Sequence, residues 1–181
     1  MTPTPQDDLT ADYDEDGELD FSDPSGDQYD SLSRDRIHVR SLMADDLPAL
    51  KLIDTAITGE DRSDYLQHQV TEAIEQSGIR VSLVAESDSG EPMGFVMARV
   101  DFGEFGRTEP EAVIDTIGVD PLYTHHGVGH AMISQLLANL RTLQVDKVRT
   151  GVRWNDYPVL HFLEECGFRP SQRLALRKRI D

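Results

Sequence analysis

A glycine-containing turn between an apolar strand and a helix has the residue types and spacing best suited to chemistry in this sequence. Gly127 and Gly129 are separated by one residue. They follow the apolar segment 112–119 and begin an amphipathic segment that runs to Thr142. Closely spaced glycines let backbone amides approach an anion, and a helix beginning there adds its positive dipole end. The turn therefore predicts a site for a phosphate-bearing ligand. The alternative is a tight turn in which glycine serves only a positive φ or close packing.

Spacing excludes two common phosphate-binding patterns. A Walker loop needs Gly-Lys-Ser/Thr, whereas His130 and Ala131 follow Gly129 here. A dinucleotide fingerprint needs a third Gly or Ala where this chain has Met132. The ligand predicted by the turn is therefore neither a Walker-type nucleotide nor a Rossmann-type dinucleotide.

Length and cysteine content limit the architecture. A chain of 181 residues is long enough for one domain with a sizeable core. The only cysteine, Cys166, excludes a disulfide within the chain, and its acidic neighbours Glu164 and Glu165 favour a buried hydrophobe over a nucleophile. We find no signal peptide and no apolar run near 18 residues, so we expect a cytoplasmic protein that does not bind a membrane.

Charge is concentrated at the start of the chain. The net charge is -17, and residues 1–33 contain eleven Asp and Glu residues but no Lys or Arg. This composition cannot bury enough apolar surface to offset its ordering entropy, so we expect a disordered acidic tail over 1–35 and a folded domain over 36–181. The tail is suited to contact with a basic partner, and the overall charge argues against nucleic acid as a substrate.

One stretch of the tail resembles the start of a calcium-binding loop. Asp12, Asp14 and Asp16 followed by Gly17 match the first six positions of an EF-hand, but position 12 is Asp23 instead of Glu. No amphipathic helix precedes Asp12. We therefore favour a plain acidic tail and predict no metal site.

The remaining sequence alternates strand-like and helix-like patterns. We predict helices over 47–57, 63–77 and 129–142, and a last helix that includes 159–163 and ends at Gly167. Asp88-Ser89-Gly90 predicts a hairpin between two of the strands. The predicted strands are 37–42, 81–86, 92–100, 112–119, 147–152 and 174–180. This order indicates an α/β domain with a mixed sheet.

Two motifs resemble one family. Val119-Asp120-Pro121 precedes Gly127-Val128-Gly129, and the last helix ends in Gly167-Phe168. With the order of elements, these motifs resemble the GNAT superfamily of acetyl-CoA-dependent N-acetyltransferases over about residues 37–181. The resemblance implies a mixed, mostly antiparallel sheet, splayed between the fourth and fifth strands and flanked by helices on both faces. It also implies acetyl-CoA as co-substrate and the amine of a small molecule or peptide as acceptor.

The resemblance further implies which residues hold acetyl-CoA. Backbone groups of Ile117 and Val119 would pair with the amides of the pantetheine arm, and the amides of 125–130 would hold the pyrophosphate. Thr124 stands where the family usually has Gln or Arg, and His125 and His126 either compensate for this or are exposed loop residues. The predicted acetyl-CoA-binding residues are Ile117, Val119, Thr124, His125, His126, Gly127, Val128, Gly129, His130, Asp156 and Leu163.

The catalytic groups of the family are partly missing. Leu163 aligns with the Tyr that serves many members as general acid, and Gly151 stands where some protein-acetylating relatives have a Glu base. A different group must then deprotonate the amine, directly or through water. Asp115 is our first candidate, because it lies two residues before Ile117 and shares its face if no bulge intervenes.

Glu111 and Tyr123 are the next candidates, and Asp156 follows them. For Asp115 the competing interpretation is an ion pair with Arg99 or Arg149.

Two functions from different classes therefore stay open. The first is an acetyltransferase that joins acetyl-CoA and an amine in a ternary complex. The second is a catalytically silent domain of the same fold that binds acyl-CoA or a protein. A homodimer is compatible with either function, and in a third possibility the acidic tail itself is the functional part.

Overall fold

The computed structural model describes residues 36–76, 79, 81–102, 109–172 and 175–180. The predicted acidic tail, 1–35, and the calcium-loop resemblance within it lie outside the described residues. The boundary between tail and domain therefore stays a prediction.

One five-stranded sheet forms the centre of the described residues, with the strands in the order β1-β2-β3-β4-β5. The first three neighbouring pairs are antiparallel, whereas β4 and β5 are parallel. A parallel pair needs a crossover, and the helix α4 (Val128–Thr142) supplies it. The strands are β1 (His38–Ser41), β2 (Leu83–Glu86), β3 (Pro92–Phe102), β4 (Pro110–Val119) and β5 (Lys147–Thr150). The predicted mixed, mostly antiparallel sheet is confirmed.

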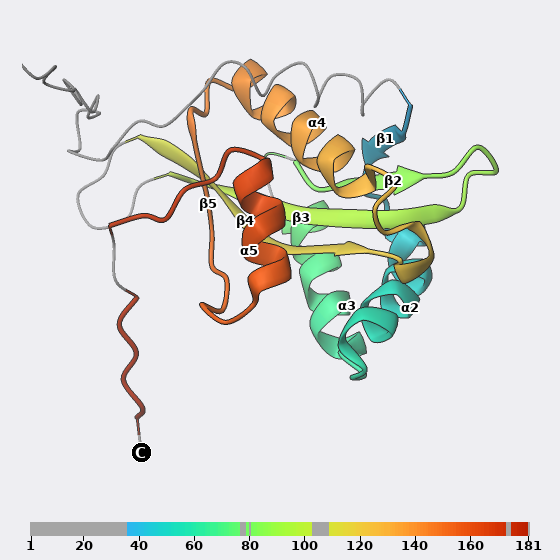
Figure 1. Ribbon diagram of the computed structural model, residues 1–181, viewed down its shortest axis with the longest axis horizontal. Helices are drawn as coiled ribbons and strands as arrows, with labels where there is room; N and C mark the ends of the chain where they lie inside the picture. Colours follow the sequence, from blue (N-terminus) through green and yellow to red (C-terminus); the bar gives the residue numbers. More distant parts are fainter. Residues whose placement is uncertain (1–35, 77–78, 80, 103–108, 173–174, 181) are drawn as a thin grey trace, which may run out of the picture.

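Helices cover both faces of the sheet, as predicted (Figure 1). On one face, α4 and α5 (Tyr157–Glu165) enclose a core that includes Ala112, Ile114 and Leu136. On the other face, α2 (Leu47–Thr58) and α3 (Ser63–Thr71) enclose a second core around Phe95 and Met97. Alternation along the strands explains the two cores, because successive side chains of a strand point to opposite faces.

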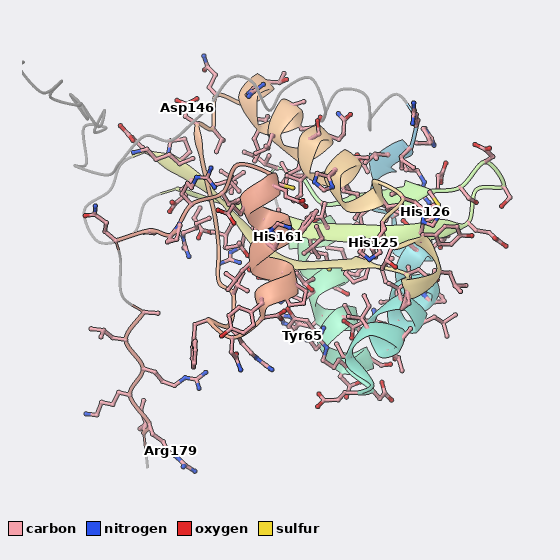
Figure 2. All side chains as sticks on the ribbon, viewed as in Figure 1. Tyr65, His125, His126, Asp146, His161 and Arg179 are labelled. Atoms are coloured by element: carbon pink, nitrogen blue, oxygen red, sulfur yellow. The ribbon has the colours of Figure 1, made fainter. Side chains whose placement is uncertain are left out.

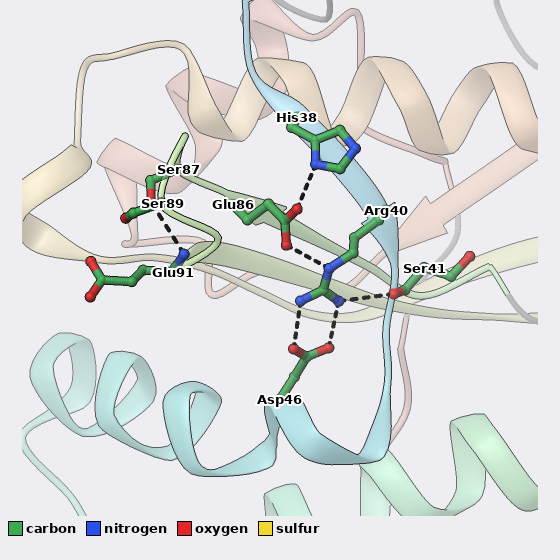
Figure 3. Close-up of polar contacts among 8 residues, drawn as sticks. All are labelled: His38, Arg40, Ser41, Asp46, Glu86, Ser87, Ser89 and Glu91. Carbon is green, nitrogen blue, oxygen red and sulfur yellow. Dashed lines mark hydrogen bonds and ion pairs between the residues drawn. The ribbon is translucent and has the colours of Figure 1, made fainter.

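An ion-pair cluster fixes the corner between β1 and α2 (Figure 3). Arg40 donates to both carboxylate oxygens of Asp46, each at 2.8 Å, and to Glu86 at 2.6 Å. Burial raises the pKa of Asp46, but hydrogen bonds from Arg40 and from the Met43 amide outweigh burial, so this pKa lies below its usual value. His38 contacts the other oxygen of Glu86 at 2.6 Å. The cluster anchors the start of α2, which forms one wall of the second core.

Two predicted elements differ from the structure. Residues 175–180 are not a strand, because no other strand among the described residues supplies hydrogen-bond partners for them. The predicted helix 63–77 is interrupted, since α3 ends at Thr71 and a π-helical turn over Glu72–Gln76 follows. The other predicted helices and strands are present, with shifts of a few residues at their ends.

Candidate functional site

β4 and β5 part within the length of β4. Their pairing runs from Glu111 opposite Lys147 to Ile114 opposite Thr150, and β4 then continues for five more residues to Val119. The Thr150 hydroxyl donates to the Ile114 carbonyl at 3.1 Å, where the strands separate. Within the described residues, one edge of 115–119 thus has no strand partner. This is the predicted splay.

A bulge lies at the same place. Ala98 of β3 is opposite Ile114, but Met97 is opposite Thr116, so Asp115 is an extra residue on β4. Before the bulge, the even-numbered residues Ala112 and Ile114 face α4. After it, the odd-numbered residues Ile117 and Val119 face α4. The condition that no bulge intervenes is therefore not met, and Asp115 does not share a face with Ile117. The extra residue turns Asp115 to the face covered by α2 and α3.

Asp115 belongs to a ribbon of ion pairs on that face, which we define as Asp115, Arg99, Asp101, Arg149 and Glu111. Arg99 donates to Asp115 and, at 3.1 Å, to Asp101. Arg149 contacts Asp101 at 3.4 Å and Glu111 at 3.0 Å. The hydrogen bond to Asp115 raises the pKa of Arg99 and so keeps it charged. The predicted alternative, an ion pair between Asp115 and Arg99, is present in the structure.

The first two catalytic candidates therefore share one surface, whereas the third lies elsewhere. Asp115 and Glu111 are linked through the two arginines of the ribbon. Tyr123 packs instead against the core on the α4 side. Both carboxylates are thus held in ion pairs.

A tyrosine from α3 lies near Asp115. Burial raises the pKa of Tyr65, and the negative charge of Asp115 raises it further, so the hydroxyl stays protonated at neutral pH. The guanidinium carbon of Arg62 lies 5.3 Å from the centre of the Tyr65 ring, and Arg62 also donates to the buried Asp54. Polar groups from α2, α3 and the sheet thus gather on the α3 side of the splay. Tyr65 lies within the predicted helix 63–77, and its place in that pattern gives no sign of a role at the site.

The glycine turn has the form expected of an anion site. Asp120 accepts a hydrogen bond from the Leu122 amide at 2.8 Å, and this closes the short turn that follows β4. Gly127 is the N-cap of α4, with a φ of 82°, and no side chain caps the helix. The first amides of an α-helix have no partner within the helix. They are therefore available, with the positive helix end, to an anion placed beside Gly127.

Gly129 has a different role. A Cβ atom at Gly129 would lie 2.9 Å from Cε2 of Phe162, so the glycine lets α5 pack closely against the first turn of α4. His130 adds an edge-to-face contact with the same ring, with 5.2 Å between ring centres. Glycine at position 129 thus serves close packing, whereas glycine at position 127 suits the positive φ of the N-cap.

We expect Gly129→Ala to destabilise the fold by about 1–3 kcal/mol, because the added methyl group overlaps the Phe162 ring. The double variant Gly129→Ala/Phe162→Leu relieves that overlap. Urea unfolding should show that the two changes together cost less than the sum of their separate costs. Additive costs would contradict the close contact.

The other predicted binding residues surround the turn. His125 and His126 are exposed, His125 has a φ of 62°, and the Nδ1 of His126 donates to the Thr124 carbonyl at 2.8 Å. Thr124 itself donates to the Pro121 carbonyl at 3.0 Å. The hydroxyl and imidazole groups thus hold the turn together, and both histidine rings remain open to solvent (Figure 2).

Two predicted binding residues lie at or within α5. Asp156 is the N-cap residue before α5, and Leu163 is buried near the C-terminal end of that helix. A leucine carries no proton donor, so the general acid of the family is not supplied at this position.

Across the described residues, we find no group of three or more His, Cys, Asp or Glu side chains arranged to hold a metal ion. Among the helices of those residues, none has the length and apolar character needed to cross a membrane.

Residues 43–168 match the model of the acetyltransferase (GNAT) family. The chain belongs to this family. The GNAT match spans β4, the glycine turn, α4 and α5, the elements that form the site. By family, this is an acyl-CoA-dependent acetyltransferase domain.

Among curated proteins, the GNAT domain is similar to a mycothiol acetyltransferase of Propionibacterium freudenreichii subsp. shermanii, with 33% identity over 86 residues. The match covers 48% of this chain, and this chain spans only 27% of that relative.

Solved structures support the fold. The aminoglycoside antibiotic 6'-N-acetyltransferase AAC(6')-Ih from Acinetobacter baumannii gives a TM-score of 0.67 at 15% identity, over 80% of this chain and 99% of that chain. The aminoglycoside N-acetyltransferase AAC(6')-Iy in complex with CoA gives a TM-score of 0.66 at 15% identity, over 79% of this chain and 94% of that chain. At this identity the likeness establishes the GNAT fold alone.

Proposed function

We propose that this GNAT domain transfers an acetyl group from acetyl-CoA to a primary amine of a small molecule or peptide by direct attack in a ternary complex. The observation that carries the proposal is that β4 parts from β5 after Ile114 and leads, through the glycine turn, to the uncapped first turn of α4. The open edge of β4 suits an amide-bearing arm, and the helix amides suit a pyrophosphate. The likeness to a fold solved with CoA bound adds support.

The residues around the splay fit acetyl-CoA. Ile117 and Val119 lie on the part of β4 that β5 leaves open, so their backbone groups can pair with the pantetheine amides as an added strand would. Gly127 places the first amides of α4 beside the same opening. The exposed rings of His125 and His126 can add donors to the phosphate oxygens when protonated.

The reaction forms one bond and breaks one bond. The amine nitrogen bonds to the acetyl carbon, the carbon–sulfur bond breaks, and CoA leaves as its thiolate. A thiolate is a fair leaving group near neutral pH, because the pKa of an ordinary thiol is about 8.5. Positioning of the amine and a backbone donor to the developing oxyanion can therefore carry much of the rate without a general acid at Leu163.

The charges around Asp115 favour a cationic amine as the acceptor. The ribbon contains three carboxylates and two guanidinium groups, and Asp115 lies at the point where the strands part. An acidic surface raises the local concentration of a cation. Solved structures of the same fold include proteins named as aminoglycoside acetyltransferases.

We expect Asp115→Asn to lower kcat by about 100-fold, with a much smaller change in the KM for the amine, if Asp115 accepts the proton of the attacking amine. Asp101→Asn is the matched control, because it also removes an ion pair with Arg99 but lies away from the splay. We expect the control to keep kcat within about threefold of the parent protein. The measurement is thiol release from acetyl-CoA over a panel of primary amines at several pH values.

Asp115→Asn should also alter the acid side of the kcat profile against pH. Equal losses of kcat in Asp115→Asn and Asp101→Asn, with an unchanged pH profile, would assign the ribbon a structural role. Another residue or water would then act as the general base.

The second candidate is a catalytically silent GNAT domain that binds acyl-CoA or a protein. Leu163 favours it, because this buried residue provides no acid, and both Asp115 and Glu111 are held in ion pairs. Acetyl-CoA binding without thiol release for any amine would support this candidate against the transferase.

We also propose a cytoplasmic location for the protein and a regulatory or solubility role for the acidic segment 1–33. Removal of residues 2–33 should leave acetyl transfer unchanged. Loss of transfer in the shortened chain would make the acidic segment part of the active unit instead.

A further inference from the structure

The end of α4 farthest from the glycine turn borders a cavity of about 200 Å³. The helix has 15 residues, and a rise of about 1.5 Å per residue puts its two ends roughly 20 Å apart. Figure 2 shows Asp146, which lines the cavity, beside one end of α4, and His125 and His126 of the glycine turn near the other. The cavity is therefore separate from the proposed acetyl-CoA site.

The floor of this cavity is apolar. Leu140 and Val145 are buried, and Leu137 and Val148 are partly buried side chains packed against the same core. The Val145 amide donates to the Leu140 carbonyl at 3.0 Å, which holds the chain against the last turn of α4. An apolar group placed in the cavity would cover Leu137 and Val148 and extend the core, and removing apolar surface from water is favourable.

Charges of both signs line the same cavity. Arg141 belongs to α4, Lys147 begins β5 and Asp146 precedes it. Arg141 has an interaction within the chain, and the Nζ of Lys147 lies 3.7 Å from a carboxylate oxygen of Glu109. A guanidinium group has five N–H donors, so Arg141 can bind a carboxylate in addition to its contact within the chain. The exposed carboxylate of Asp146 can accept hydrogen bonds from an ammonium group.

Size and charge together select one class of ligand. Drug-sized ligands occupy pockets of roughly 300–1,000 Å³, so the smaller cavity suits a smaller molecule. The apolar floor suits an aliphatic chain, Arg141 suits a carboxylate and Asp146 suits an ammonium group. A fatty acid would leave its carboxylate close to Asp146 with no ammonium group between the two charges, and an aliphatic amine would leave its ammonium group close to Arg141. An α-amino acid carries all three groups.

We propose that the cavity between α4 and β5 binds a free α-amino acid with an aliphatic side chain, such as L-leucine. The carboxylate of the amino acid contacts Arg141, its ammonium group contacts Asp146, and its side chain covers Leu137 and Val148. This site lies outside the acetyl transfer proposed above, and its occupancy is measured without turnover.

Isothermal titration of three ligands into the full chain tests the proposal. The ligands are L-leucine, 4-methylpentanoate, which lacks the ammonium group, and 3-methylbutylamine, which lacks the carboxylate. We expect one L-leucine per chain, bound at least about tenfold more tightly than either of the others, because each of these lacks one hydrogen-bonded charge. Absence of saturable L-leucine binding, or equal affinity for all three ligands, would overturn the proposal.

Two variants assign the charged contacts. Arg141→Gln should remove the advantage of L-leucine over 3-methylbutylamine, and Asp146→Asn its advantage over 4-methylpentanoate, because each variant removes the partner of one charged group. Arg153→Gln is the matched control, since Arg153 is exposed in the connection from β5 to α5 and does not line the cavity. We expect the control to keep the affinity of the parent chain. Equal losses in all three variants would contradict binding in the cavity.

L-leucine also has a primary amine, so its binding at the splay must be distinguished from binding in the cavity. We expect Asp115→Asn, and likewise saturation with acetyl-CoA, to leave L-leucine binding unchanged. Loss of binding in Asp115→Asn, with full binding in Arg141→Gln, would place the amino acid at the splay and overturn the proposal. Thiol release is not measured here, so failure of the proposed function would not be mistaken for failure of the amino-acid site.

Discussion

Replacement of Gly127 by aspartate should weaken acetyl-CoA binding by at least about 100-fold. The new carboxylate would lie at the N-cap of α4, where the free amides are proposed to hold the pyrophosphate. Two like charges about 4 Å apart repel by about 4 kcal/mol at the effective dielectric constant typical of a protein surface. Isothermal titration of acetyl-CoA into the folded variant measures the loss directly.

Asparagine at position 127 is the matched control. Asparagine and aspartate have nearly the same shape, and both tolerate the left-handed conformation that the φ of 82° requires. We expect Gly127→Asn to lose less than about tenfold in affinity, because the amide adds no repulsion. Similar affinities for the aspartate and asparagine variants would remove the anion site from the start of α4.

Replacement of Arg40 by methionine should lower the free energy of unfolding by about 3 kcal/mol, because it leaves the Asp46 carboxylate almost buried without its cation. The side chain of Asp46 is 6% exposed, and Arg40 makes two hydrogen bonds to it. The double variant Arg40→Met/Asp46→Asn should recover part of the loss, since a neutral amide costs less to bury than a charge. Urea unfolding of the parent chain, Arg40→Met, Asp46→Asn and the double variant completes this double-mutant cycle.

The pH dependence of this loss follows from the lowered pKa of Asp46. A carboxyl group whose pKa is lower in the folded state stabilises the fold above its unfolded pKa of about 3.9, and the contribution disappears as the pH falls through the folded pKa. The difference between the parent chain and Arg40→Met should therefore be largest near neutral pH and shrink below about pH 4. A difference that is constant over this range would contradict the ion pair as its source.

The sequence was sufficient for most of the fold because hydrophobic periodicity marks helices and strands locally. Leu47 and Pro48 begin α2 where capping and periodicity predict it, and Gly59 ends it with a φ of 72°. Residues 174–180 show where periodicity alone fails. Their alternation predicts a strand, but a strand also needs a neighbouring strand to pair with, and alternation within one segment does not show whether one is present.

The site was predictable in the parts that depend on the backbone. The spacing of Gly127 and Gly129 indicated the turn, and Gly127 does adopt a positive φ at the start of α4. The bulge at Asp115 was not predictable, because it is defined by the register of β4 against β3. Tyr65 was missed for a similar reason, since its approach to Asp115 depends on how α3 packs on the sheet.

The most direct test of the central claim is isothermal titration of acetyl-CoA into the full chain, with free pyrophosphate as competitor. We predict one bound acetyl-CoA per chain, with competition by pyrophosphate that is lost in Gly127→Asp. Absence of binding, or binding that Gly127→Asp leaves unchanged, would contradict the assignment of the splay and the start of α4 as the acetyl-CoA site.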